Sequence, residues 1–352
     1  MRRLVAGVSL FAVLSLGFTS TVCADKVVLV AGGSEKGKVV DPFAVDFDKH
    51  GNMYFVEMGG NRLCRLDSRG KIATFAGNGM KGDKGDGGPA ADAVLGGPHH
   101  LAIMPYGDIL ISDTWNSRVR KVDAKTGMIS AIAGTGEKGF GGDGGPATAA
   151  KIGNVYCAAL TPDSSKLYLA DLDNRRIRLV DMKTGIITTV AGNGKKGVPE
   201  DGAVAVDAPL FDPRAVAADA KGNVWILERS GHVLRVVDAH GKIRTVAGTG
   251  KAGFSGDGGD ARKAAMNGPK HLFVDHHGDI LIVDTENHCI RKLKVADGTI
   301  HRVAGSGKKG AAGLDGPPEK VELNRPHGVY EDAHGVIYIA DSSNNRILKI
   351  VK

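Results

Sequence analysis

The sequence predicts an all-β protein: a six-bladed β-propeller with four-stranded antiparallel blades, the last of which is closed by the N-terminal strand. Three observations support this prediction. One pattern recurs six times at intervals of 56 to 59 residues, and each copy holds short β-patterned runs separated by turn residues. A single extra run precedes the first copy, and the last copy ends one run short. Repeated four-stranded units of this length are typical of propeller blades.

Each repeat unit follows the same order. An apolar run after the opening residue leads to a glycine-containing turn and a second run that ends in an acid. A third run, often begun by arginine, is followed by a fourth run that ends in Ala-Gly. The units open near Pro42, Pro98, Asn154, Pro213, Pro269 and Pro326. We therefore predict a single propeller domain over residues 25–352.

The acid that ends the second run recurs in every unit, so we expect it to be structural. We expect it to accept hydrogen bonds from the next turn or to pair with the arginine that opens the third run. The acids are Glu57, Asp113, Asp171, Glu228, Asp284 and Asp341, and the arginines are Arg62, Arg118, Arg176 and Arg346. Units four and five carry Val233 and Cys289 at the arginine position.

The run at 26–32, Lys-Val-Val-Leu-Val-Ala-Gly, matches the fourth runs of the later units, such as 242–248. The sixth unit reaches Lys352 after three runs. We therefore expect residues 26–33 to supply the missing strand of the last blade, beside residues 346–352. Such closure removes a bare sheet edge and joins the two ends of the chain.

The first 24 residues have the pattern of a secretory signal: Arg2 and Arg3, an apolar stretch to Phe18, and Val22 and Ala24 before the expected cut. We expect export, to the periplasm or outside the cell. The cleaved chain would keep three cysteines without local pairing, which is not a disulfide framework.

The motif Arg-Pro-His-Gly-Val at 325–329, followed by Ile-Tyr-Ile-Ala-Asp at 337–341 and Asn-Arg-Ile at 345–347, resembles the NHL repeat family. The resemblance extends over the predicted domain and implies the six-bladed fold. It indicates the fold much more strongly than a function, because propellers of one architecture carry many functions.

Long connections between units contain Asp-Gly turns, as in Gly85-Asp86-Gly87-Gly88. Acids on tight glycine turns suit calcium, but the spacing does not match an EF-hand loop. We favour a structural role, in which glycine provides a positive φ and aspartate binds nearby backbone amides. One helical turn is expected after each of these motifs.

The first strand of each blade should line the central channel, and the residues after each opening should surround its mouth on the loop face. The candidate ligand-binding residues are His99, Asn154, Arg214, Lys270 and His327. Strand alternation predicts that the residues one place later, His100, Tyr156 and His271, point the other way. The mixed set is neutral to cationic, so it suits an anionic ligand.

A resemblance to peptidyl-α-hydroxyglycine α-amidating lyases would imply a catalytic zinc held by histidines of Pro-His pairs on alternate blades. Here His99 and His327 fit that pattern, but Arg214 stands at the third position and cannot bind zinc. Gluconolactonase-like hydrolases would imply a divalent cation held by Glu, Asn and Asp, and only Asn154 matches. A divalent metal, zinc or calcium, at His99 and His327 is therefore the alternative hypothesis.

These observations favour an exported, non-enzymatic binding scaffold for an anionic small molecule, a peptide or a glycan. A metal-dependent lyase or lactonase-like hydrolase that uses His99 and His327 is the alternative, and an interaction propeller within a larger envelope assembly is a third hypothesis. The formal charge of +7 comes from scattered lysines and arginines. The sequence has no stripe of aromatic and basic residues of the kind that binds nucleic acid, and no second apolar run that could span a membrane. We expect a monomer.

Overall fold

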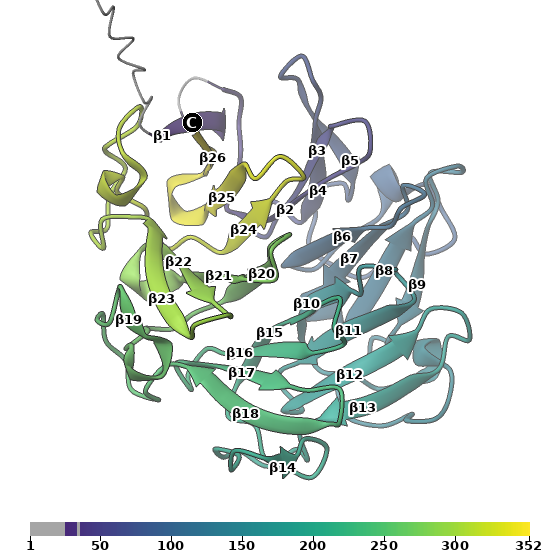
Figure 1. Ribbon diagram of the computed structural model, residues 1–352. Helices are drawn as coiled ribbons and strands as arrows, with labels where there is room; N and C mark the ends of the chain where they lie inside the picture. Colours follow the sequence, from purple (N-terminus) through teal and green to yellow (C-terminus); the bar gives the residue numbers. More distant parts are fainter. Residues whose placement is uncertain (1–24, 34–35) are drawn as a thin grey trace, which may run out of the picture.

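The computed structural model describes residues 25–33 and 36–352, and it is a six-bladed propeller of antiparallel sheets (Figure 1). The predicted signal at 1–24 lies outside the described residues. The innermost strands of the six sheets, β2, β6, β10, β15, β20 and β24, surround the centre of the molecule. The predicted fold class is confirmed.

Each blade is a meander that runs from the channel to the outer edge. Blades one to three consist of β2 (Pro42–Phe47), β3 (Met53–Glu57), β4 (Arg62–Leu66), β5 (Ile72–Ala76); β6 (His100–Ile103), β7 (Ile109–Asp113), β8 (Arg118–Val122), β9 (Ile129–Ala133); and β10 (Val155–Leu160), β11 (Lys166–Asp171), β12 (Arg176–Asp181), β13 (Ile187–Ala191). Blades four to six consist of β15 (Pro213–Ala218), β16 (Val224–Glu228), β17 (Val233–Val237), β18 (Lys242–Ala247); β20 (His271–Val274), β21 (Ile280–Asp284), β22 (Cys289–Lys294), β23 (Thr299–Ala304); and β24 (Gly328–Glu331), β25 (Ile337–Asp341), β26 (Arg346–Val351) with β1 (Lys26–Gly32).

The connections between blades add short elements. Two-residue strands, β14 (Ala203–Val204) and β19 (Gly259–Asp260), extend the sheets of blades four and five. The expected helical turns are 3₁₀ turns in four of the five loops: η1 (Ala90–Asp92), η3 (Ala147–Ala149), η4 (Ala261–Lys263) and η6 (Pro318–Lys320). The prediction is wrong for the loop before blade four, where β14 follows the Asp-Gly turn at 201–202. Three more 3₁₀ turns join the second and third strands: η2 (Thr114–Asn116), η5 (Thr285–Asn287) and η7 (Ser342–Asn344).

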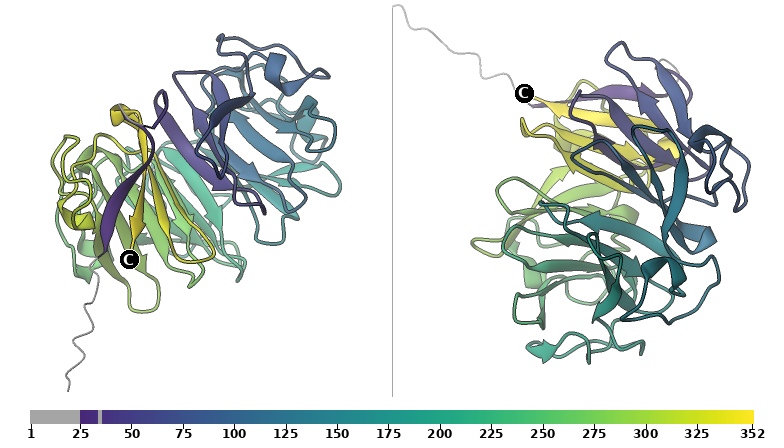
Figure 2. Two further views of the ribbon diagram at one scale, coloured as in Figure 1. Left: turned by 90° about the horizontal axis from the view of Figure 1, so that it is seen from above. Right: turned by 90° about the vertical axis from the view of Figure 1, so that its right-hand side faces the viewer.

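Strand β1 closes blade six, as predicted. It pairs antiparallel with β26 from Lys26 opposite Val351 to Gly32 opposite Arg346. Figure 2 shows the purple N-terminal strand lying along the yellow C-terminal one. The side chains of Val27 and Ala31 are fully buried in this arrangement, so the closing strand contributes to the core between blades.

The six acids that end the second strands are fully buried. Each accepts a hydrogen bond from a backbone amide in the loop before its own blade, at 2.6–2.9 Å. The expected arginine pairs with the acid only in blades one and six, as Arg62–Glu57 at 2.6 Å and Arg346–Asp341 at 2.7 Å. The structural role of the acids therefore agrees with the prediction, but the arginine assignment needs correction.

In blades two to five the pairing arginine stands two residues later in the third strand. The pairs are Arg120–Asp113, Arg178–Asp171, Arg235–Glu228 and Arg291–Asp284, at 2.7–3.5 Å. Strand alternation puts positions two apart on the same face of a sheet, so either position can reach the acid. Blades four and five have thus not lost their arginine; Arg235 and Arg291 supply it.

The Asp-Gly loops use the same buried arginines. Asp86 lies 2.8 Å from Arg120, Asp143 lies 2.7 Å from Arg178, and Asp257 lies 2.8 Å from Arg291. These aspartates thus join their loops to the next blade through ion pairs. The prediction that they bind nearby backbone amides did not include these arginine partners. Each of these three acids therefore has an arginine partner in the structure, although the sequence alone was compatible with calcium binding at the loops.

The cores between blades are mainly aliphatic, and the described cysteines, Cys64, Cys157 and Cys289, are buried and unpaired with one another. Among the described residues, no helix is long and apolar enough to cross a membrane.

Candidate functional site

The register of the first two strands in each blade aligns the six blades residue by residue. Ala44, His100, Ala215, His271 and Gly328 each stand opposite the residue before the blade's acid. Three rings of equivalent positions follow down the channel. The loop-face ring, one residue before those positions, is Phe43, His99, Tyr156, Arg214, Lys270 and His327. The middle ring is Ala44, His100, Cys157, Ala215, His271 and Gly328. The pocket ring, two residues further along each strand, is Asp46, Ala102, Ala159, Ala217, Phe273 and Tyr330.

Blade three is shifted by one residue from the sequence alignment. Val155 pairs with Asp171, as Pro42 pairs with Glu57. The loop-face residue of blade three is therefore Tyr156. Asn154 lies outside the ring, where its backbone N–H donates to the Asp173 carboxylate at 3.1 Å.

The alternation expected at the channel mouth is also incomplete. A β-bulge lies at the start of β2, β10 and β15, where the register shifts between Pro42 and Ala44 and at the equivalent places. A bulge redirects the side chain of the extra residue. The histidines of the middle ring still face the channel, because His100 and His271 meet across it with their Nε2 atoms 3.0 Å apart.

Both of these histidines are buried, and burial lowers the pKa of His100 to about 4 and that of His271 well below its ordinary value. The Nδ1 of His271 accepts the backbone N–H of Val329 at 3.4 Å. The Nε2 of neutral His271 therefore carries the proton and donates to His100. This neutral pair separates the loop-face end of the channel from the opposite end.

Aromatic contacts hold the loop-face ring together. The rings of Phe43 and His327 stack with centroids 4.0 Å apart, and His99 packs edge-on against Phe43 and Tyr156 at 4.8 and 4.7 Å. The Nδ1 atoms of both histidines bond to backbone carbonyls two residues earlier, at 2.7 Å for His99 and 2.8 Å for His327. Their Nε2 atoms are the ones left for other partners.

Arg214 is the unusual member of this ring. Its side chain is only 5% exposed, and its guanidinium lies 4.0 Å from the centroid of Tyr156. Its Nε is buried without a hydrogen-bond partner, and among the described residues no carboxylate comes within ion-pair distance. Asp212, the acid whose charge influences the Arg214 guanidinium, is bound instead to Arg229 at 3.0 Å and to Ser230.

Burial lowers the pKa of Arg214 to about 10, although the group stays charged at neutral pH. Its charge contributes to the lowered pKa values of His99, His100, His271 and His327, after burial as the main cause for each. Arg214 therefore lies close to the channel axis, within electrostatic reach of the loop-face ring and the middle ring.

Lys270 adds a second positive charge. Its ammonium lies 2.9 Å from the Glu286 carboxylate and 3.3 Å from the Nε2 of His327, and burial lowers its pKa to about 8. Glu286 also binds Arg325 at 2.8 Å, so one carboxylate serves two cations. The loop-face ring therefore has more positive charge than its ion pairs neutralise.

The predicted metal ligands do not fit a divalent cation. Phe43 packs against both His99 and His327, and the ammonium of Lys270 faces the free nitrogen of His327. Two cationic side chains, Arg214 and Lys270, stand where a third ligand would be needed. Among residues 25–33 and 36–352, no group of three His, Cys, Asp or Glu side chains could hold a metal.

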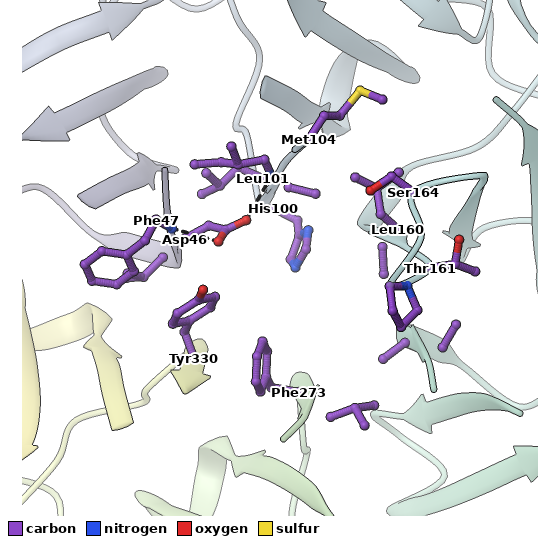
Figure 3. Close-up of a pocket in the computed structure, with 18 of the residues that line it drawn as sticks. Asp46, Phe47, His100, Leu101, Met104, Leu160, Thr161, Ser164, Phe273 and Tyr330 are labelled. Atoms are coloured by element: carbon purple, nitrogen blue, oxygen red, sulfur yellow. Dashed lines mark hydrogen bonds between the residues drawn. The ribbon is translucent and has the colours of Figure 1, made fainter. Parts of the chain in front are cut away.

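The sequence-based reasoning missed a cavity at the other end of the channel. It has a volume of about 400 Å³, and all six residues of the pocket ring line it, together with His100 and His271 (Figure 3). Its signal was present in the sequence: Asp46, Phe273 and Tyr330 occupy a position where blades two to four have alanine. Only the register showed that these residues share a ring.

Residues 323–350 match the NHL repeat model. The chain is 27% identical over 239 residues to SUPPRESSOR OF QUENCHING 1, chloroplastic, of Arabidopsis thaliana, which covers 65% of the chain. It is 26% identical over 286 residues to NHL repeat-containing protein 2 of Gallus gallus, which covers 71%. The matches span only 22% and 38% of the lengths of these relatives.

Among solved structures, an auxiliary nutrient binding protein from Bacteroides thetaiotaomicron superposes with a TM-score of 0.67 at 17% sequence identity. The match covers 93% of this chain and 76% of the other. At this identity the likeness shows a shared fold.

Proposed function

We propose that this chain, an NHL-repeat six-bladed propeller, is a non-enzymatic binding protein that holds an anionic group of its ligand at the loop-face mouth of the channel. The observation that carries this proposal is Arg214, a buried arginine without a carboxylate partner in the described part of the chain. A buried charge without a partner is costly to the folded protein. A bound anion would compensate it, as in the charge-assisted pairs that arginine forms with carboxylates and phosphates.

The neighbours of Arg214 support the same ligand class. Lys270 adds a positive charge, and His99 and His327 offer Nε2 atoms at the same level of the channel. Burial holds the pKa of each histidine well below its ordinary value, so each is neutral at pH 7. Their Nδ1–H groups donate to backbone carbonyls, which leaves Nε2 as a hydrogen-bond acceptor, so Arg214 and Lys270 are the groups that would donate to a bound anion. A carboxylate or phosphate group on a small molecule, an acidic peptide or an acidic glycan would suit this set. The nutrient-binding description of the Bacteroides propeller is consistent with a binding role.

Export is part of the proposal. Strand β1 begins at Lys26, two residues after the expected cut behind Ala24, so cleavage would leave the closing strand intact. Mass spectrometry of the protein recovered from a periplasmic extract should give an N-terminus at Asp25. Recovery of the uncleaved chain from the cytoplasm alone would contradict export.

The binding proposal is tested by calorimetric titration of the protein with acetate, phosphate, an acidic tripeptide and a uronic acid at low ionic strength. At least one anion should bind, and the Arg214→Gln variant should weaken it at least tenfold. Arg69→Gln is the matched control, because the Arg69 side chain is 86% exposed on the outer edge of blade one. Unchanged affinity in Arg214→Gln, or no binding by any member of the panel at about 10 mM, ten times a Kd of about 1 mM, would overturn the proposal.

A further inference from the structure

The pocket ring divides the cavity at the far end of the channel into two unlike halves. Blades two to four contribute Ala102, Ala159 and Ala217, which leave open space. The other three blades contribute Phe273, Tyr330 and Asp46 (Figure 3). Within this ring a polar and aromatic half faces an apolar half, in a cavity of about 400 Å³ that Lys49, Thr161 and Ser164 also line.

Asp46 is the negatively charged group of this cavity. Its two carboxylate oxygens accept the backbone N–H groups of Phe47 at 2.7 Å and of Ile103 at 2.9 Å. No lysine, arginine or histidine of the described chain forms an ion pair with it, in contrast to the paired acids of the blades. Burial raises the pKa of Asp46 to about 7, as expected for a carboxylate without a positive partner.

Two aromatic side chains of the pocket ring line the cavity together with Asp46. The rings of Phe273 and Tyr330 lie 5.0 Å apart at an angle of 54°, and Figure 3 shows the Tyr330 hydroxyl directed toward Asp46. Aromatic faces attract organic cations through the negative potential of the ring face, and a carboxylate adds a full opposite charge. Together they form a recognition set for an ammonium group.

The remaining titratable groups at the cavity do not neutralise Asp46. His100 faces it from the channel side and is neutral, since burial lowers its pKa to about 4. Burial raises the pKa of Tyr330, so the phenol keeps its proton. Lys49 lines the cavity with an exposed side chain and forms no ion pair with Asp46.

We propose that this cavity is a second binding site, for a small organic cation with an alkylammonium group and a short apolar body. The ammonium lies against Asp46 and the aromatic faces of Phe273 and Tyr330, and the body extends over the three alanines. The neutral pair His100 and His271 separates this site from the loop-face ring. The site is therefore independent of the anion site.

The probes are choline and its neutral isostere 3,3-dimethyl-1-butanol, titrated by calorimetry at pH 8 against the full chain. Choline should bind and the neutral alcohol should bind at least tenfold more weakly. Asp46→Asn should weaken choline binding at least tenfold, whereas the matched control Asp92→Asn should leave it unchanged, because Asp92 is exposed and does not line the cavity. Equal binding of the two probes, or no binding of choline, would overturn the proposal.

Two further variants separate the possible causes of a lost signal. Ala159→Leu fills the cavity without changing charge, and it should abolish choline binding even if Asp46→Asn fails to fold. Arg214→Gln should retain choline binding, so failure of the anion site and failure of this site are distinguishable. Choline binding that survives Ala159→Leu would place the cation elsewhere and refute the assignment.

Discussion

Replacing Arg214 by methionine should make this protein more stable, although the substituted residue lies at the proposed binding site. Burial lowers the pKa of Arg214 from its ordinary value to about 10. One pKa unit corresponds to about 1.4 kcal/mol, so the positive charge costs the folded state about 3 kcal/mol at neutral pH. Because the folded-state pKa is the lower one, this cost is complete at every pH below about 10.

Methionine keeps most of the apolar contact but loses the stacking on Tyr156, which is 4.0 Å from the guanidinium. That interaction contributes about 1 kcal/mol. The net expectation is a gain of about 2 kcal/mol in the free energy of unfolding. Urea denaturation at pH 7 and low salt, followed by tryptophan fluorescence, measures this difference directly.

Arg235→Met is the matched control, because Arg235 is equally buried but binds Glu228 at 2.7 Å. Its removal leaves a buried carboxylate without a partner and should cost about 3–5 kcal/mol. A saturating anion should reduce the difference between the wild type and Arg214→Met, since only the wild type binds it. If Arg214→Met proved less stable than the wild type by about 1 kcal/mol or more, the guanidinium would be compensated and the reasoning refuted.

Three further predictions concern the closing strand, the cavity and the buried acids. Deleting residues 26–33 should lower the melting temperature markedly, because it removes a paired strand and two buried apolar side chains worth about 3 kcal/mol; an unchanged melting temperature would contradict closure. Choline affinity should fall about tenfold per pH unit below pH 7 and level off above pH 8, because protons compete for Asp46; a flat calorimetric profile from pH 5.5 to 8.5 would count against its role. Asp341→Ala should cost about 3–5 kcal/mol in urea denaturation, because it leaves the buried Arg346 without its partner at 2.7 Å; a loss below about 1 kcal/mol would argue against that pair.

The repeat pattern predicted most of the fold, for a local physical reason. Each blade is built from neighbouring strands joined by short turns, so the order of apolar runs, glycine turns and acids specifies it within about 57 residues. Closure by residues 26–32 was predictable too, because a fourth-strand pattern stood where no blade had begun. Four of the five expected channel-mouth residues share one ring in the structure, and Asn154 does not.

The prediction that Asn154 lies at the channel mouth was wrong because it rested on counting residues between repeats. The turn between β8 and β9, at 123–128, is one residue longer than the equivalent turn at 67–71 in blade one. Counting from the preceding unit therefore gave a register one residue off, whereas strand pairing with Asp171 sets it at Val155. The arginine partners of the buried acids were misassigned for a similar reason. Positions two apart on one strand share a face, and only the packing of the following loop decides which arginine reaches the acid.

The sequence by itself determined the number of blades, their strand order and the closure of the ring, because those depend on local propensity and periodicity. Only the tertiary structure decided which charges lack partners. Arg214 and Asp46 look like other arginines and aspartates in the sequence, and their lack of an ion-pair partner among the described residues depends on side chains from other blades. The electrostatic energy of a charged group depends on the groups within a few ångströms of it, and in a propeller those neighbours come from blades far apart in the chain.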